Sequence, residues 1–139
     1  MRTTFLVLLM PLLATAALAQ TKTINDTQCE ITVPSNWAES KVGGVGAHAA
    51  DRSLTAQLHS FQASDYPSAV DSLKQMSATV LEDNSSRMVL EMPMGGTSRK
   101  QVFVLTKTKP VGCRASVMYS QPALAATAKQ IAESVKPLK

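Results

Sequence analysis

Apolar and polar residues alternate near the start of the chain in the pattern of a half-buried strand. Within residues 27–33 every second side chain from Cys29 onwards is apolar, and the Pro-Ser-Asn sequence at 34–36 predicts the end of this strand. Residues 47–50 and 54–61 predict the two arms of a β-hairpin, with its bend at residues 51–53.

Apolar residues spaced three or four positions apart predict two amphipathic helices. The first is expected to begin near residues 66–68, where proline suits a first turn, and to stop at 83–85. The second is expected to begin at Pro122 and to end at Pro137. Their buried stripes are expected to be Val70, Leu73, Met76 (or Ser77) and Val80 in the first helix, and Leu124, Ala128, Ile131 and Val135 in the second.

Three further strands are predicted between the two helices, at residues 87–92, 101–106 and 113–119. Residues 102–105 are all apolar, which is typical of a central strand covered on both faces. Short turns favour antiparallel pairing, and both helices must bury their apolar stripes on the sheet. The expected fold class is α+β: a mostly antiparallel sheet of five to six strands with one helix on each face, which is an α/β/α sandwich.

Residues 1–19 have the organisation of a secretory signal peptide. Arg2 provides the positive charge, an apolar stretch begins at Phe5, and Ala17-Leu18-Ala19 gives the small-x-small cleavage pattern. We therefore expect one exported α+β domain of residues 20–139, periplasmic if the host is Gram-negative and secreted otherwise. No later apolar stretch approaches ~20 residues, so no membrane span is expected in the mature chain.

The chain contains two cysteines, Cys29 and Cys113. In an oxidising compartment, one pair of cysteines in a small domain most simply forms a disulfide, which here would tie the first predicted strand to the last. The alternative is a reactive or metal-binding thiol pair, for which the sequence offers no C-x-x-C motif.

The segment Val33-Pro34-Ser35-Asn36-Trp37, followed by strands, a helix, three strands and a C-terminal helix, resembles the PsbP-like and DcrB-like superfamily. Members of that superfamily commonly carry a strand, a proline, two residues and a tryptophan in this order. The likeness in element order covers residues 24–136. It implies an α/β/α sandwich used mainly as a non-catalytic binding or assembly module, with no shared catalytic residues. The Cys29/Cys113 pair and the glycine-rich segment after Trp37 depart from the pattern.

Catalytic motifs are absent from the sequence. It has no G-x-S-x-G or S-x-x-K motif, and its two histidines are His48 and His59, with Asp51 three residues after the first. Histidines with so few accompanying ligands do not predict a zinc site. We expect a protein that is not an enzyme and binds no cofactor. A small hydrolase assembled from distant residues remains the second alternative.

Three methionines suggest the first alternative, a periplasmic protein that binds a soft metal. Met88, Met92 and Met94 are separated by even numbers of residues, so in one regular strand their side chains would point to the same face. Their thioether sulfur atoms are soft ligands that suit Cu(I). Pro93 interrupts the regular strand beyond Met92. The competing interpretation is that these methionines fill the core beneath a helix, as flexible side chains often do.

The formal charge of +4 is mild, and the basic residues are scattered. Aromatic residues make up 4% of the chain, too few to supply stacking platforms, so a nucleic-acid partner is not expected. The leading hypothesis is a monomeric binding or accessory protein whose partner is another envelope or secreted protein. An inhibitor or immunity-type protein is one specific form of it.

Candidate contact residues lie in and near the glycine-rich loop at residues 38–53, because loops on a rigid scaffold often carry binding. Trp37 has two interpretations: a contact residue of this surface, or a plug at the edge of the core. The full set of candidates is Trp37, Lys41, His48 and Arg52, with Arg99 and Lys100 at a later turn as second choices.

Overall fold

The structure is a computed structural model of the chain, and it describes residues 20–139. The expected signal peptide at 1–19 lies outside the described residues. In chain order the elements are β1 (Thr21–Asn25), β2 (Cys29–Pro34), β3 (Ala38–Ser40), β4 (Val45–His48), β5 (Leu54–Gln62), α1 (Tyr66–Gln75), β6 (Thr79–Asp83), β7 (Arg87–Pro93), β8 (Lys100–Thr106), β9 (Val111–Tyr119), α2 (Ala125–Glu133) and β10 (Lys136–Pro137). A single 3-10 turn, at Ala63–Asp65 and at Pro122–Leu124, precedes each α-helix.

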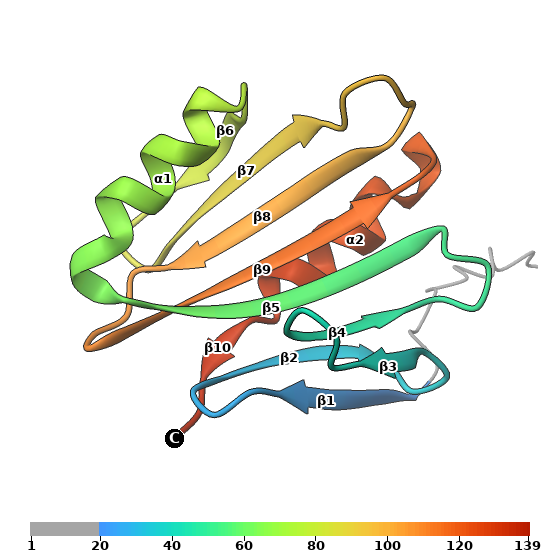
Figure 1. Cartoon of the computed structure of the whole chain (residues 1–139), viewed down its shortest axis with the longest axis horizontal. Helices are drawn as coiled ribbons and strands as arrows, with labels where there is room; N and C mark the ends of the chain where they lie inside the picture. The colour runs from blue at the N-terminus through green and yellow to red at the C-terminus, as the bar shows by residue number, and fades with distance from the viewer. Residues whose placement is uncertain (1–19) are drawn as a thin grey trace, which may run out of the picture.

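The strands form two antiparallel sheets (Figure 1). One has seven strands in the order β3-β4-β5-β9-β8-β7-β6, and the other has three in the order β1-β2-β10. The α+β class and the mostly antiparallel sheet are therefore confirmed. The number of strands exceeds the expected five to six, and β2, the first predicted strand, lies in the smaller sheet. β1 was not predicted because only Ile24 among its residues is buried, so it has no apolar alternation.

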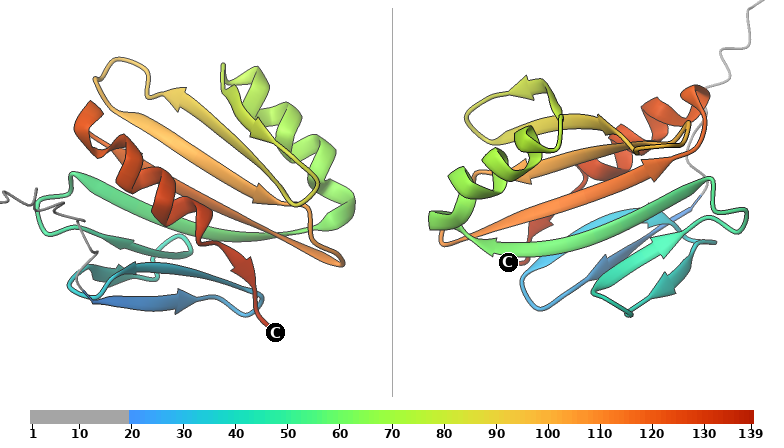
Figure 2. Two further views of the ribbon diagram at one scale, coloured as in Figure 1. Left: turned by 180° about the vertical axis from the view of Figure 1, so that it is seen from behind. Right: turned by 45° about the horizontal axis from the view of Figure 1, so that its top comes forward.

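The two helices lie on opposite faces of the seven-stranded sheet, as expected (Figure 2). The larger core lies between this sheet, α2 and the smaller sheet, and it includes Ile31, Val117 and Ile131. The smaller core lies beneath α1 and includes Leu73 and Phe103. The central strand β8 contributes side chains to both cores, which explains its continuous apolar run.

α1 ends earlier than the apolar spacing predicted. The helix stops at Gln75, Ser77 adopts a left-handed conformation with φ of 69°, and the amide of Ala78 donates to the carbonyl of Leu73 at 3.0 Å. Such a left-handed residue is a common way for a helix to terminate. The chain then enters edge strand β6, so Met76 is 54% exposed and Val80 is 39% exposed. Placing these two residues in a buried helical stripe was wrong.

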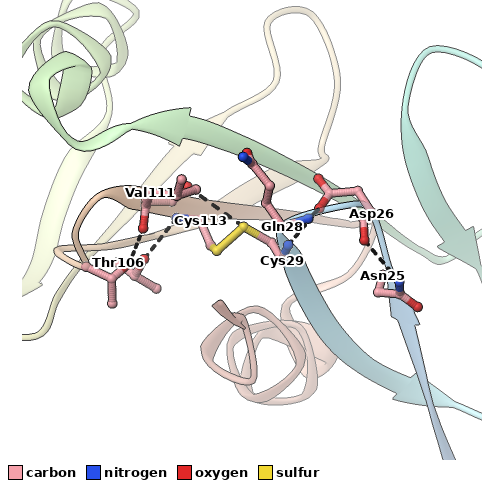
Figure 3. The surroundings of a disulfide bond; sticks show 9 residues. Asn25, Asp26, Gln28, Cys29, Thr106, Val111 and Cys113 are labelled. Carbon is pink, nitrogen blue, oxygen red and sulfur yellow. Dashed lines mark hydrogen bonds between the residues drawn. A yellow bond between two sulfur atoms is a disulfide. The ribbon is translucent and has the colours of Figure 1, made fainter. Parts of the chain in front are cut away.

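The expected disulfide between Cys29 and Cys113 is present and joins β2 to β9, so it ties the two sheets together (Figure 3). Both sulfur-bearing residues are fully buried. On one side, the Asp26 carboxylate accepts the Cys29 amide at 2.7 Å. On the other, the Thr106 hydroxyl accepts the Cys113 amide at 2.9 Å. The backbone on both sides of the bridge is therefore fixed by hydrogen bonds.

Tyr119 should make the stability of the fold depend on pH in the alkaline range. Its hydroxyl donates to the Glu91 carboxylate at 2.8 Å, and burial followed by this carboxylate raises the pKa of Tyr119 to about 12. The folded state thus holds this proton more tightly than the unfolded state. The stabilisation is complete below pH 10.0, the ordinary value, and is lost as the pH rises toward about 12. In urea unfolding, Tyr119→Phe should lose less stability than the native chain between pH ~8 and pH ~11. Equal losses would contradict this assignment.

Candidate functional site

One part of the seven-stranded sheet has no helix over it on the side that carries α1. Phe103 and Leu105 of β8 pack beneath α1, and their cross-strand neighbours on β9 are Ser116 and Arg114. Directly opposed residues share a face of a sheet. In the described chain, no helix crosses β4, β5 or β9 on this side (Figure 1). We call the side chains there the open face: Gly46, His48, Thr55, Gln57, His59, Arg114, Ser116 and Met118.

The register arranges the open face in three rows across the strands. The rows, each written from β4 or β5 to β9, are His48–Thr55–Met118, Gly46–Gln57–Ser116 and His59–Arg114. Gln57 is exposed, whereas Ser116 is only 3% exposed because neighbouring side chains cover it. The open face is therefore a rigid, mostly polar surface, held by the main-chain hydrogen bonds of a sheet.

A shallow hollow of about 140 Å³ lies at the β4 side of the open face. Gly46 forms part of its lining, and a Cβ atom at this position would come within 2.8 Å of the Ala56 carbonyl oxygen. Any larger residue would push β4 away from β5, so the chain needs glycine there. His48, Arg52 and Thr55 also line the hollow. The sequence placed two of these, His48 and Arg52, in a contact surface.

His48 is oriented by its own backbone. Its Nδ1 lies 2.9 Å from the Ala49 carbonyl oxygen, and because a carbonyl can only accept, Nδ1 donates in this bond. Nε2 is then left as the nitrogen that can contact a ligand. Asp51, the nearby carboxylate, instead accepts the Ser53 hydroxyl at 2.7 Å and the Ser53 amide at 3.0 Å. No hydrogen bond links His48 to Asp51 in the described structure.

His59 and Arg114 are direct cross-strand neighbours on β5 and β9. Burial, followed by the charge of Arg114, holds the pKa of His59 below its ordinary value. Burial also lowers the pKa of Arg114, although an arginine side chain stays protonated in proteins. The pair therefore presents one fixed positive charge beside a neutral imidazole at neutral pH.

The other contact residues expected from the sequence lie at different places. Trp37 is 6% exposed and belongs to the larger core, which favours the alternative of a core plug. Lys41 is exposed in the loop before β4. Arg99 and Lys100 lie at the turn between β7 and β8, and Lys100 pairs with Glu91 at 3.6 Å. That turn lies at the same end of the sheet as the β4–β5 turn that carries Arg52 (Figure 1).

The methionines suggested as a soft-metal site are placed by β7. Met88 is 6% exposed in the smaller core, Met92 packs against that core, and Met94 follows the end of the strand. His48 lies on β4, four strand spacings or ~19 Å from Met92. Burial thus favours core packing for Met88. Within residues 20–139, no group of three or more histidine, cysteine or acidic side chains is arranged to hold a metal ion.

Sequence reasoning missed Thr55, Gln57, Arg114 and Ser116. A signal for the last two existed: β9 alternates Cys113, Ala115 and Val117 with larger or more polar residues, unlike β8. This alternation indicates a strand that is covered on one face only. None of the helices in the described part of the chain has the length and apolar character needed to cross a membrane.

Comparison with solved structures places the fold among known ones. The chain is similar to cyanobacterial PsbP (CyanoP) from Synechocystis sp. PCC 6803, with a TM-score of 0.58 and 12% identity over 89% of this chain and 96% of that chain. It is also similar to a protein from Bacteroides thetaiotaomicron VPI-5482, with a TM-score of 0.55 and 16% identity over 80% of this chain and 45% of that one. No protein-family model and no curated protein sequence matches the chain. The expected resemblance to PsbP-like proteins is confirmed for the fold.

Proposed function

We propose that this chain, whose fold is PsbP-like, is an exported, non-catalytic binding or accessory protein that acts through contacts with another protein. The observation that carries the proposal is the open face, a polar surface of three adjacent strands with no helix over it. A surface held by a sheet needs little ordering when a partner binds, which favours affinity. The PsbP-like fold supports the accessory role.

Export is supported by two independent features. The sequence at residues 1–19 has the pattern of a signal peptide, and the buried Cys29–Cys113 disulfide is typical of oxidising compartments. The proposed mature protein is residues 20–139, periplasmic in a Gram-negative host, monomeric, and partnered by an envelope or secreted protein. An inhibitor or immunity-type protein would be one form of this function.

The hydrogen bonding of the candidate nucleophiles and bases favours binding over hydrolysis. Nucleophilic catalysis by serine needs a base within hydrogen-bond reach that is oriented by a third group. His48 is bonded to a backbone carbonyl, and Asp51 is bonded to Ser53. Neither arrangement prepares a nucleophile. The polar groups of the open face instead form a set of donors and acceptors suited to recognition.

A paired substitution tests the use of the open face. Gln57 is exposed on the open face, whereas Gln130 is exposed on α2, on the opposite side of the sheet. The exported protein, tagged after Lys139, would be used to capture partners from the envelope fraction of the host. Gln57→Trp should reduce retention of a stoichiometric partner about tenfold, as a loss of ~1.4 kcal/mol would, while Gln130→Trp should retain it.

Two outcomes would contradict the proposal. One is a folded and oxidised bait that retains no stoichiometric partner. The other is a partner that both tryptophan variants retain equally well, since contact would then lie elsewhere. Comparison of the two variants also controls for nonspecific adhesion, because each adds the same apolar side chain to an exposed position.

A further inference from the structure

Arg114 carries a positive charge that no carboxylate of the described chain neutralises. Among residues 20–139, none of the ion pairs includes Arg114, and its Nε atom is buried without a hydrogen-bond partner. Arg87 also has a buried Nε without a hydrogen-bond partner, but its Nη2 lies 3.4 Å from Glu82 and 3.5 Å from Glu133, so its charge is paired. The remaining described arginines, Arg52 and Arg99, are exposed and can be hydrated.

The strands around Arg114 contain donors and no acid, and the charge of Asp26, in the β1–β2 turn, acts on His59. Strands β4, β5, β8 and β9, which make up the open face and its border with α1, contain no aspartate or glutamate. His59 is the cross-strand neighbour of Arg114, and the next row holds Gln57 opposite Ser116. An imidazole, an amide and a hydroxyl can each donate a hydrogen bond to an anion. The guanidinium and these three donors therefore favour a negative group here, while the charge of Asp26 opposes one on the His59 side.

The state of Arg114 is costly for the isolated protein. A buried donor without a partner has lost its hydrogen bonds to water without forming new ones. A partly desolvated charge likewise raises the free energy of the folded state unless a counter-charge lies nearby. The guanidinium is planar and binds a carboxylate through two parallel hydrogen bonds, more strongly than neutral groups bind each other. A carboxylate supplied from outside the chain would give the guanidinium of Arg114 the counter-charge that it lacks.

The amount of charge favours a carboxylate over a phosphate. Because burial and the nearby Arg114 lower the pKa of His59, the imidazole is neutral at neutral pH and the pair carries a single positive charge. One carboxylate matches one guanidinium. A phosphate near its second pKa would bring up to two negative charges, of which one would remain uncompensated.

We propose that Arg114 anchors a carboxylate-binding site on the open face, with Gln57, His59 and Ser116 as flanking donors. This inference rests on the proposed function and names the chemistry of the partner: the site receives an acidic side chain of the bound protein. A small free carboxylic acid has the same recognition chemistry, and the experiment separates the two sources.

The experiment is an NMR titration of the exported, oxidised, isotope-labelled protein with poly-L-glutamate and, separately, with acetate. Binding should move the Nε–H resonance of Arg114 and the amides of His59 and Ser116. Arg114→Gln should weaken poly-L-glutamate binding about tenfold, as the loss of a charged hydrogen bond of ~1.5 kcal/mol implies. Arg99→Gln, which removes an exposed charge at a turn, should change it less than about twofold.

A second variant keeps the test valid if Arg114→Gln does not fold. Gln57 lies diagonal to Arg114 across the β5–β9 pair, within reach of a long side chain. Gln57→Glu should therefore place a carboxylate of the chain itself beside Arg114 and weaken added carboxylates. Gln130→Glu, with the same charge change on the far side of the sheet, should weaken them much less.

The outcomes distinguish an acidic protein segment from a small free acid, and they test the carboxylate site separately from the proposed function. Tighter binding of poly-L-glutamate than of acetate, per carboxylate, identifies an acidic segment, whereas equal binding identifies a small free acid. Stronger binding of inorganic phosphate, or equal weakening by Arg114→Gln and Arg99→Gln, overturns the site. A partner captured equally by native protein and Arg114→Gln also overturns it, while the proposed function stands.

Discussion

Replacing Cys29 and Cys113 together by alanine is expected to lower the free energy of unfolding by about 4 to 5 kcal/mol. The two residues are 84 positions apart, and a cross-link that closes so long a loop removes much of the entropy of the unfolded chain. Because small domains are stable by only about 5–15 kcal/mol, the double variant should be close to the limit of folding. Urea unfolding of the oxidised native chain and of the variant measures the difference.

Reduction of the native chain separates the cross-link from the packing of the sulfur atoms. The reduced protein keeps both thiols in the core but loses the covalent bond, so it should lose most of the same stability. Both cysteines are fully buried, so the alanine variant should lose a further ~1 kcal/mol through the small cavities it creates. If reduction changed the urea midpoint very little, the disulfide would contribute little to the fold.

Ile131→Ala should have the second largest effect, a loss of about 3 kcal/mol. Ile131 is 2% exposed on the buried side of α2, and α2 packs on β2, β8 and β9. The residue therefore sits where the helix meets both sheets. Its truncation removes apolar contacts with each of them and leaves a cavity that the rigid sheets cannot close. The midpoint of urea unfolding should fall without a large change in slope.

Leu81→Ala is the matched control for Ile131→Ala. Leu81 is also a large aliphatic residue, but it is 50% exposed at the irregular register of edge strand β6. Its truncation should change the free energy of unfolding by about 0.5 kcal/mol or less, as surface substitutions usually do. Similar losses from the two variants would show that α2 does not hold the two sheets together.

Much of the fold follows from local pattern, and the reasons are visible in particular residues. The β4–β5 hairpin and strands β7, β8 and β9 were predicted because their apolar residues alternate or follow one another, although the first arm of the hairpin, expected at residues 47–50, lies at Val45–His48. The placement of one helix on each face followed from β8, whose residues Val102 to Leu105 are all buried. The disulfide was predicted because the chain has two cysteines and a signal-peptide pattern that indicates an oxidising compartment.

The elements that were missed depend on distant partners. β10 has two residues and exists because it pairs with Glu30 and Cys29 of β2. β6 begins where the apolar spacing of α1 happens to continue through Val80, so periodicity alone could not locate the end of the helix. Tertiary pairing decided these segments, and it leaves little signal in a short stretch of sequence.

The open face could be predicted only in part, because it is a product of pairing register. His48 and Arg52 were proposed from a loop, and they line the hollow. Arg114 is far from both in sequence, and its neighbours His59, Gln57 and Leu105 become its neighbours only in the folded sheet. A lone arginine in a strand gives no indication that no carboxylate will meet it.

The pairing of β10 with β2 has a consequence for the order in which the protein can mature. The Ser134 hydroxyl accepts the Thr32 amide at 2.9 Å and donates to the Ile131 carbonyl at 2.6 Å, and the Leu138 amide donates to the Gln28 carbonyl. Until residues 134–138 have left the ribosome, β2 lacks the edge partner that pairs with Glu30 and Cys29. The smaller sheet can therefore be completed only after residues 134–138 have been synthesised, whereas hairpins such as β7–β8 can pair earlier.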